Sequence, residues 1–569
     1  MAETKIIKII KFNNNILTTI SVITFLGFIT FLHLINGEVQ PNDEGQLAIQ
    51  THNCINSGML YEKVLNQNTI SGYSPISIVS MAASFNLFGE STFAIRFFTA
   101  LCSLVSLVFV YLLARRLVNE ETSSIAVLLT FGTESWNLFS RQANSELPFL
   151  CFALISLWSV LKITETNLIK AKILYLFIFI LTFLLCLLTK LNTAFIPILF
   201  IFPIVFSKTH WKNAVALLFS SVFSITSFFL LYYYVFQITP DSILSHFTNY
   251  SINFDLKNFF GGINQLIINN AVAVIPIIFF ILSIFNRKKL RLESNLAFKI
   301  LTIWFIAAFL IFSIFTFKET NGQLYFILPI IILAVYFFEH FSAIFKRNTH
   351  KSIFISFLIL SAVWSYLIFF RYSINDYFLF NKNLPFLSIL MIILLTVVFI
   401  IPFLLTNKSK EFLTKTFKTV FYIVLYAVML KAIIFNSFYP VGNSAGAVSV
   451  ANYIERTTPS CFIYLYHNLK PADSLNSQLA WYLNQLSDNG GKKKVCKPIP
   501  LNKEKLILRE VFDLIEFKED IIVYYISDDM LLSLSIFNEL VETRELLLQT
   551  KNYLVFSKVV RGATNYVFV

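Results

Sequence analysis

Long apolar runs, many of them close to 20 residues, recur through the first three quarters of the chain. A helix of about 20 apolar residues matches the hydrocarbon core of a bilayer. The hydropathy rule predicts about thirteen membrane-spanning helices, at residues 16–35, 94–114, 124–140, 147–161, 173–189, 193–207, 214–236, 267–285, 297–316, 324–345, 352–370, 385–405 and 419–437. Because 56% of the residues are hydrophobic and only 14% are charged, a water-soluble enzyme and a disordered chain are both excluded.

The formal charge of +13 has an explanation in these helices. Basic residues gather in alternate connections, for example at 115–116, 162–172 and 287–291, while the opposite connections carry mostly single cations. The positive-inside rule then predicts a multi-pass protein of the inner (plasma) membrane, with a cytoplasmic N-terminus. An odd number of crossings places the C-terminus on the outer, periplasmic side. The charge mainly records topology, so we expect no nucleic-acid partner.

The composition changes near Tyr439, where long apolar runs stop and acidic and basic residues balance. We predict two domains, a transmembrane domain at 1–438 and an extracytoplasmic domain at 439–569. Within the second, strands are expected at 461–466, 520–526 and 553–559, with a periodic stretch at 530–548 and an exposed turn at 492–494. The predicted fold is therefore an all-α polytopic membrane protein with a small C-terminal α/β domain.

The predicted outer connections hold acids and cations that lie close to the membrane surface. A carboxylate there can act as a general base, and a lysine or arginine can hold a phosphate leaving group. The candidates are Asp43, Glu44, Arg141, Glu146, Lys190, Lys318 and Tyr325. The plainer alternatives are that the acids are solvated, that Arg141 pairs with Glu146, and that Lys190 extends to lipid headgroups. The cysteines and histidines form no spacing that predicts a metal site.

The order of several short motifs resembles the GT-C glycosyltransferases. The nearest branch contains the aminoarabinose transferases of lipid A and the protein O-mannosyltransferases. The segments that carry the resemblance are Asp43-Glu44, Leu87–Ser91, Ala94–Arg96, Tyr111–Arg116, Arg141 with Glu146, Leu188-Thr189-Lys190 and Tyr325–Pro329. The likeness is good at 37–197, thinner to about residue 345, and architectural beyond.

The resemblance implies a GT-C fold and transfer of a sugar from a polyprenyl-phosphate donor to a lipid, glycan or protein acceptor on the outer face, with inversion. It gives Asp43 the role of general base and Glu146 that of the second acidic residue. Lys190 falls on a phosphate-binding lysine. Lys318 and Tyr325 lie in a segment that helps to hold the donor phosphate, and Glu44 and Arg141 are further expected donor contacts.

The chain also departs from the aminoarabinose transferases. They carry a Glu-Lys-Pro triplet where this chain has Gly72-Tyr73-Ser74-Pro75, and an arginine where it has Gln46. The sugar and the use of a divalent metal therefore stay open, and no metal ligand or certain cofactor is assigned. Two other functions compete with the transferase, a transporter or flippase of polyprenyl-linked glycans and a non-catalytic membrane subunit.

Overall fold

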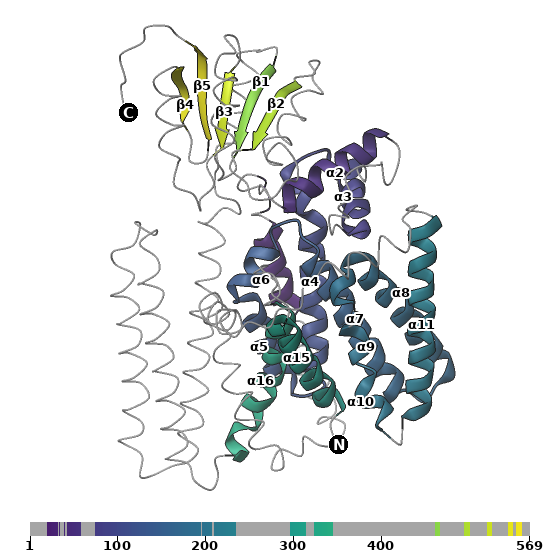
Figure 1. Ribbon diagram of the computed structural model, residues 1–569. Helices are drawn as coiled ribbons and strands as arrows, with labels where there is room; N and C mark the ends of the chain where they lie inside the picture. The colour runs from purple at the N-terminus through teal and green to yellow at the C-terminus, as the bar shows by residue number, and fades with distance from the viewer. Residues whose placement is uncertain are drawn as a thin grey trace, which may run out of the picture. The chain divides into compact units, whose positions relative to one another are not determined.

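The computed structural model is shown in Figure 1. The described residues are 20–31, 34, 39, 43–57, 74–194, 196–207, 210–234, 296–314 and 324–344, together with five strands between 461 and 559. The chain divides into two compact units. One comprises 1–33, 63–77 and 98–439, and the other comprises 34–62, 78–97 and 440–569. The two domains predicted from the sequence, 1–438 and 439–569, stay a prediction.

The first unit is helical wherever it is described. Its elements are the first helix Ile20–Phe31, α4 (Thr92–Ala114, from residue 98), α5 (Glu120–Phe131), α6 (Glu134–Phe139), α7 (Glu146–Glu165), α8 (Ile169–Thr189), η2 (Leu191–Thr193), α9 (Ile196–Leu199), α10 (Phe202–Val205), α11 (Trp211–Tyr234), α15 (Leu296–Ile314) and α16 (Leu324–Ile344). Helix α7 packs on α8, α8 on α11, α15 on α16, and α16 on α5.

Four of the described helices, α4, α7, α8 and α11, are long and apolar enough to cross a membrane. The structure does not confirm the count of thirteen. The predicted spans at 267–285, 352–370, 385–405 and 419–437 lie outside the described residues.

Helix α11 has the features of a helix that faces lipid. Phe219 and Phe223 are among its exposed apolar side chains, Trp211 is exposed at its first residue, and Tyr233 and Tyr234 are exposed at its end. Aromatic side chains favour the two membrane–water interfaces. The aromatic ends lie about 33 Å apart at 1.5 Å per residue, which matches the thickness of a hydrocarbon core of about 30 Å.

Helices α8 and α11 run parallel, so the chain between them returns along their whole length. Lys172 Nζ donates to Asn213 Oδ1 near the start of both helices, at 3.3 Å. Farther along, Ser224 Oγ donates to the Ile180 carbonyl, at 3.1 Å. The return path, predicted as one span at 193–207, is instead broken into η2, α9 and α10. Pro197 and Pro203 each remove a backbone donor, which hydropathy does not register.

The span predicted at 124–140 is also interrupted. Helix α5 ends at Phe131, and the Thr133 hydroxyl accepts a hydrogen bond from the Trp136 N–H, which starts α6 as a separate short helix. Gly132 and Thr133 are ordinary helix stop and start residues. The apolar content is continuous across them, so the sequence pattern predicted one helix where the structure has two.

The second unit contains α2 (Asp43–Ser57) and residues 78–97, which hold most of α3 (Pro75–Phe88) and the start of α4. The sequence analysis predicted no helix between the spans at 16–35 and 94–114. Gly89 follows α3 with φ 72°, a left-handed conformation that glycine adopts easily. The Phe88 ring then packs on Phe93 and Phe97, at centroid distances of 5.2 and 4.7 Å, which fixes the turn between α3 and α4.

The second unit also contains a five-stranded mixed sheet of order β2-β1-β3-β5-β4. The strands are β1 (Cys461–Tyr466), β2 (Lys494–Pro500), β3 (Ile521–Tyr525), β4 (Arg544–Gln549) and β5 (Tyr553–Val559). β1 pairs in parallel with β2 and β3, whereas β5 pairs antiparallel with β3 and β4.

Three of these strands, β1, β3 and β5, lie where the sequence predicted them. Lys494 begins β2, although the sequence predicted a turn there, and the end of the periodic stretch at 530–548 forms part of β4. In both places, pairing with a neighbouring strand overrides the local pattern. The helices expected for an α/β domain lie outside the described residues.

The contact between the first helix and α4 yields a test of packing. A Cβ atom on Gly27 would lie 2.8 Å from Leu104 Cδ1, too close without movement. We expect Gly27→Val to lower the free energy of unfolding by about 1–3 kcal/mol through overpacking, measured by thermal unfolding in detergent. Adding Leu104→Ala should make room for the valine and recover part of that free energy. Strictly additive losses for the two substitutions would contradict the contact.

Candidate functional site

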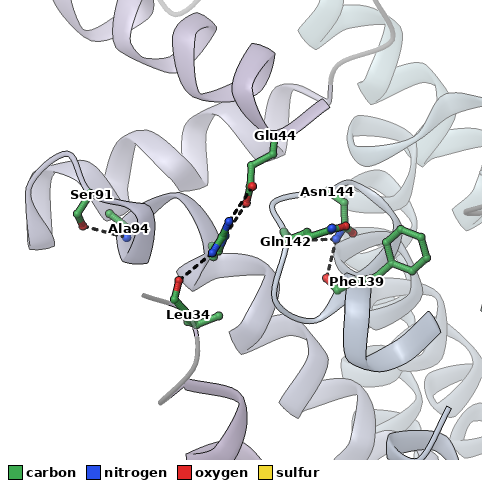
Figure 2. Close-up of polar contacts among 8 residues, drawn as sticks. Leu34, Glu44, Ser91, Ala94, Phe139, Gln142 and Asn144 are labelled. Atoms are coloured by element: carbon green, nitrogen blue, oxygen red, sulfur yellow. Dashed lines mark hydrogen bonds and ion pairs between the residues drawn. The ribbon is translucent and has the colours of Figure 1, made fainter. Parts of the chain in front are cut away.

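The turn before α7 is held by the side chain of Asn144. Its Oδ1 accepts from the Leu147 N–H at 3.1 Å. Its amide donates to the carbonyls of Phe139 and Gln142 at 2.6 and 2.8 Å (Figure 2). Asn144 therefore satisfies one of the free N–H groups at the helix start. This turn places Glu146 as the first residue of α7, where the helix dipole favours a carboxylate.

Arg141 belongs to the same turn. Its Nε donates to the Asn137 carbonyl at 3.0 Å, and its side chain is almost fully buried, with 1% exposed. Asn137 in turn donates from Nδ2 to the carbonyls of Phe131 and Thr133. The network links the end of α5, helix α6 and the turn that carries Glu146, so Arg141 lies within the support of the site.

Lys190 reaches Glu146 from the end of α8. It follows the last helical residue with extended backbone (φ −153°, ψ 96°), and its N–H donates to the Cys186 carbonyl. Its Nζ donates to Glu146 Oε1 at 2.7 Å, and the lysine and glutamate side chains are only 15% and 5% exposed. A cation beyond a helix C-terminus and an anion at a helix N-terminus both fit the helix dipoles.

Tyr325 completes the group from the second residue of α16. Its ring is buried, the Lys190 Nζ lies 5.9 Å from the ring centroid, and the ring packs edge-on against Phe149 at 5.3 Å. A cation at this distance from an aromatic ring is attracted to its face. Glu146, Lys190 and Tyr325, here the Glu146 cluster, thus meet from α7, α8 and α16, although the sequence placed them in three separate connections.

A second polar group lies in the other unit, at the start of α2. The Arg96 guanidinium donates from Nε to Glu44 Oε1 at 2.7 Å and from Nη2 to Oε2 at 3.0 Å. Its Nη1 donates to the Leu34 carbonyl at 3.1 Å (Figure 2). Asp43 is the first residue of α2, immediately before Glu44.

The predicted site residues therefore separate into three sets. Glu146, Lys190 and Tyr325 are in contact, with Arg141 supporting the turn of Glu146. Glu44 is paired in the second unit, and Lys318 lies outside the described residues. Among the described residues, no three His, Cys, Asp or Glu side chains are grouped to hold a metal ion. The sequence analysis did not assign a role to Arg96, although a charged residue in an apolar helix is a signal of function or pairing.

Comparisons with known proteins agree with this architecture. Residues 74–248 match the family model of dolichyl-phosphate-mannose-protein mannosyltransferases. The structure is similar to ArnT from Cupriavidus metallidurans bound to undecaprenyl phosphate, with a TM-score of 0.60, 15% identity, and 97% of this chain and 99% of that chain covered. The apo form of the same protein gives a TM-score of 0.58 and 14% identity over 96% and 98% of the two chains. No curated protein matches the sequence.

The family match covers residues 74–248, and the shared fold extends over almost the whole chain. The fold is that of the GT-C glycosyltransferases. The chain is accordingly a multi-pass membrane protein, as its apolar helices indicate. The resemblance found in the sequence is confirmed at this level, and the roles of individual site residues stay predictions.

The Glu146–Lys190 pair can be tested as a unit. Removing one partner leaves the other charge buried without its counter-ion, which costs about 3–5 kcal/mol. We expect Glu146→Gln and Lys190→Met each to lower the free energy of unfolding. The double variant should lower it by clearly less than the sum of the two single losses. Thermal unfolding of all four proteins in detergent measures the coupling, and additive effects would contradict a direct pair.

Proposed function

We propose that the chain transfers a sugar from a polyprenyl-phosphate donor to an acceptor on the outer face of the membrane. The Glu146 cluster carries this proposal, because it holds a lysine ammonium in a mostly buried setting, suited to a phosphate. Support also comes from the shared fold, since the similar ArnT structure contains undecaprenyl phosphate. The donor class, the face of the membrane and the mechanism are all parts of the proposal.

In this mechanism the bond between the anomeric carbon and the phosphate oxygen breaks, and the polyprenyl phosphate leaves with the bonding electrons. An acceptor oxygen attacks the anomeric carbon from the opposite side and inverts it. The proton of the acceptor passes to the Asp43 carboxylate, a role that rests on the sequence resemblance. A general base of this kind contributes about 10²–10⁴-fold to the rate.

Lys190 would stabilise the negative charge that develops on the leaving phosphate. In the described structure its ammonium contacts Glu146 and lies near the Tyr325 ring, so a phosphate oxygen would join or displace the carboxylate. Glu146 orients the ammonium, while the Tyr325 ring limits where it can move. Arg141 acts through the turn that supports Glu146, and Lys318 is expected to add a cation near Tyr325.

The membrane orientation belongs to the same proposal. The basic connections place the N-terminus in the cytoplasm and the sheet-containing C-terminal region outside, in a protein of the plasma membrane. A site on that face needs no nucleotide, because the lipid phosphate is itself the leaving group. The acceptor is a lipid, a glycan or a protein, and the sugar is a hexose or a pentose.

A panel of polyprenyl-phosphate sugars tests the donor and the reaction together. We expect the purified protein to release free polyprenyl phosphate from one donor in the presence of acceptor. Asp43→Asn should lower that rate about 10²–10⁴-fold, as loss of a general base does, while the protein still inserts and unfolds normally. Glu165→Gln, which removes an exposed partner of Arg116, serves as a matched control with unchanged rate.

Two results would overturn the proposal. Full activity of Asp43→Asn would remove this carboxylate as the base. Movement of an intact lipid-linked sugar across a vesicle bilayer, with no release of polyprenyl phosphate from any donor, would indicate the flippase instead.

A further inference from the structure

We propose that Arg96 is a positioning residue, which holds the first turn of α2 and thereby fixes the place of Asp43. The inference rests on the proposed function only through the role of Asp43 as base. Arg96 and Glu44, together with the Leu34 carbonyl, form what we call the Arg96 clamp, and every contact of the clamp lies within the second unit.

The clamp is a planar two-point pair with a third contact. Two nitrogens of the guanidinium meet the two Glu44 oxygens at 2.7 and 3.0 Å, and a third nitrogen meets the Leu34 carbonyl at 3.1 Å. The Arg96 side chain is 0% exposed and that of Glu44 is 2% exposed. A pair of this geometry is directional as well as strong, and its burial excludes competing water.

The position of the clamp in the chain explains its effect on Asp43. Leu34 lies before Asp43 in the sequence, and Glu44 follows it directly. Both are bound to one rigid guanidinium, and the contact through Glu44 holds the first turn of α2, where Asp43 is the first residue. Arg96 is itself fixed, because the Ser91 hydroxyl accepts from the Ala94 N–H at 3.2 Å and starts α4 one turn before it (Figure 2).

A second tether acts farther along α2. His52 Nδ1 lies 2.9 Å from both oxygens of Glu90, which belongs to the turn between α3 and α4. His52 is eight residues after Glu44, about 12 Å along the helix axis. Contacts at two points on one helix restrict rotation as well as translation, so α2 is held to the α3–α4 segment as a rigid arm with Asp43 at its tip.

The clamp also assigns a role to Glu44. Both of its carboxylate oxygens accept from the buried Arg96, and the Glu44 side chain is only 2% exposed, so a donor could reach it only after the residues around it moved. Glu44 therefore acts on catalysis through the place of Asp43, and contact with the donor is left to other residues.

Arg96→Lys tests the clamp, because a lysine keeps the charge but cannot form the planar two-point contact. A misplaced catalytic group costs on the order of 10²-fold in rate, so we expect kcat to fall about 10²-fold while KM for the polyprenyl-phosphate sugar changes less than about two-fold. Hydrogen exchange should increase in residues 43–57 and stay unchanged in α7 and α8. Glu165→Gln, which breaks the Arg116–Glu165 pair, is the matched control and should change neither.

If Arg96→Lys does not fold, the double variant Glu44→Gln/Arg96→Met replaces it. It removes both charges of the clamp together. We expect the same loss of kcat as for Arg96→Lys and the same increase of hydrogen exchange in α2.

The outcomes of these measurements decide the inference. An unchanged kcat, or unchanged exchange of α2, in a folded clamp variant would overturn it. A parallel rise of KM would overturn it as well, because Glu44 or Arg96 would then contact the donor. Full activity of Asp43→Asn would reject the base, and the positioning role with it, whereas an inactive Asp43→Asn beside a fully active Arg96→Lys would reject the clamp alone.

Discussion

The ion pair between Glu146 and Lys190 is the interaction on which the candidate site depends. An isolated charge is costly in a mostly buried setting, so each of these side chains is stabilised there by the other. The pair also joins the start of α7 to the end of α8, and the first turn of α16 places an aromatic ring beside the ammonium. Residues from three helices thus meet at the Lys190 ammonium.

The same solution recurs in the second unit, where a buried arginine joins the start of α4 to the start of α2. Glu146, Lys190 and Glu44 all occupy helix ends, whereas Arg96 lies in the second turn of α4. Those ends already carry unsatisfied backbone groups and a partial charge, so a polar side chain costs less there than in mid-helix. A chain made mostly of apolar helices therefore concentrates its chemistry at the points where helices begin and end.

Much of this arrangement could be predicted from the sequence, and the failures have physical causes. Hydropathy located α4, α7, α8 and α11 because apolar content and length decide whether a helix can cross a bilayer. It failed at 193–207, since it does not register the backbone donors that Pro197 and Pro203 remove. The motif order indicated Glu146, Lys190 and Tyr325. The partner of Arg96 could not be predicted from local pattern, because 52 residues separate it from Glu44.

The broken return path between α8 and α11 has a consequence for how the protein is made. Its short helices leave carbonyl and N–H groups that lipid cannot satisfy, and they are covered by later parts of the chain. Phe200 packs on the buried Trp304 of α15, and α9 and α10 both contact that helix. The return path therefore gains this part of its cover only once α15, about 100 residues later in the chain, is in place.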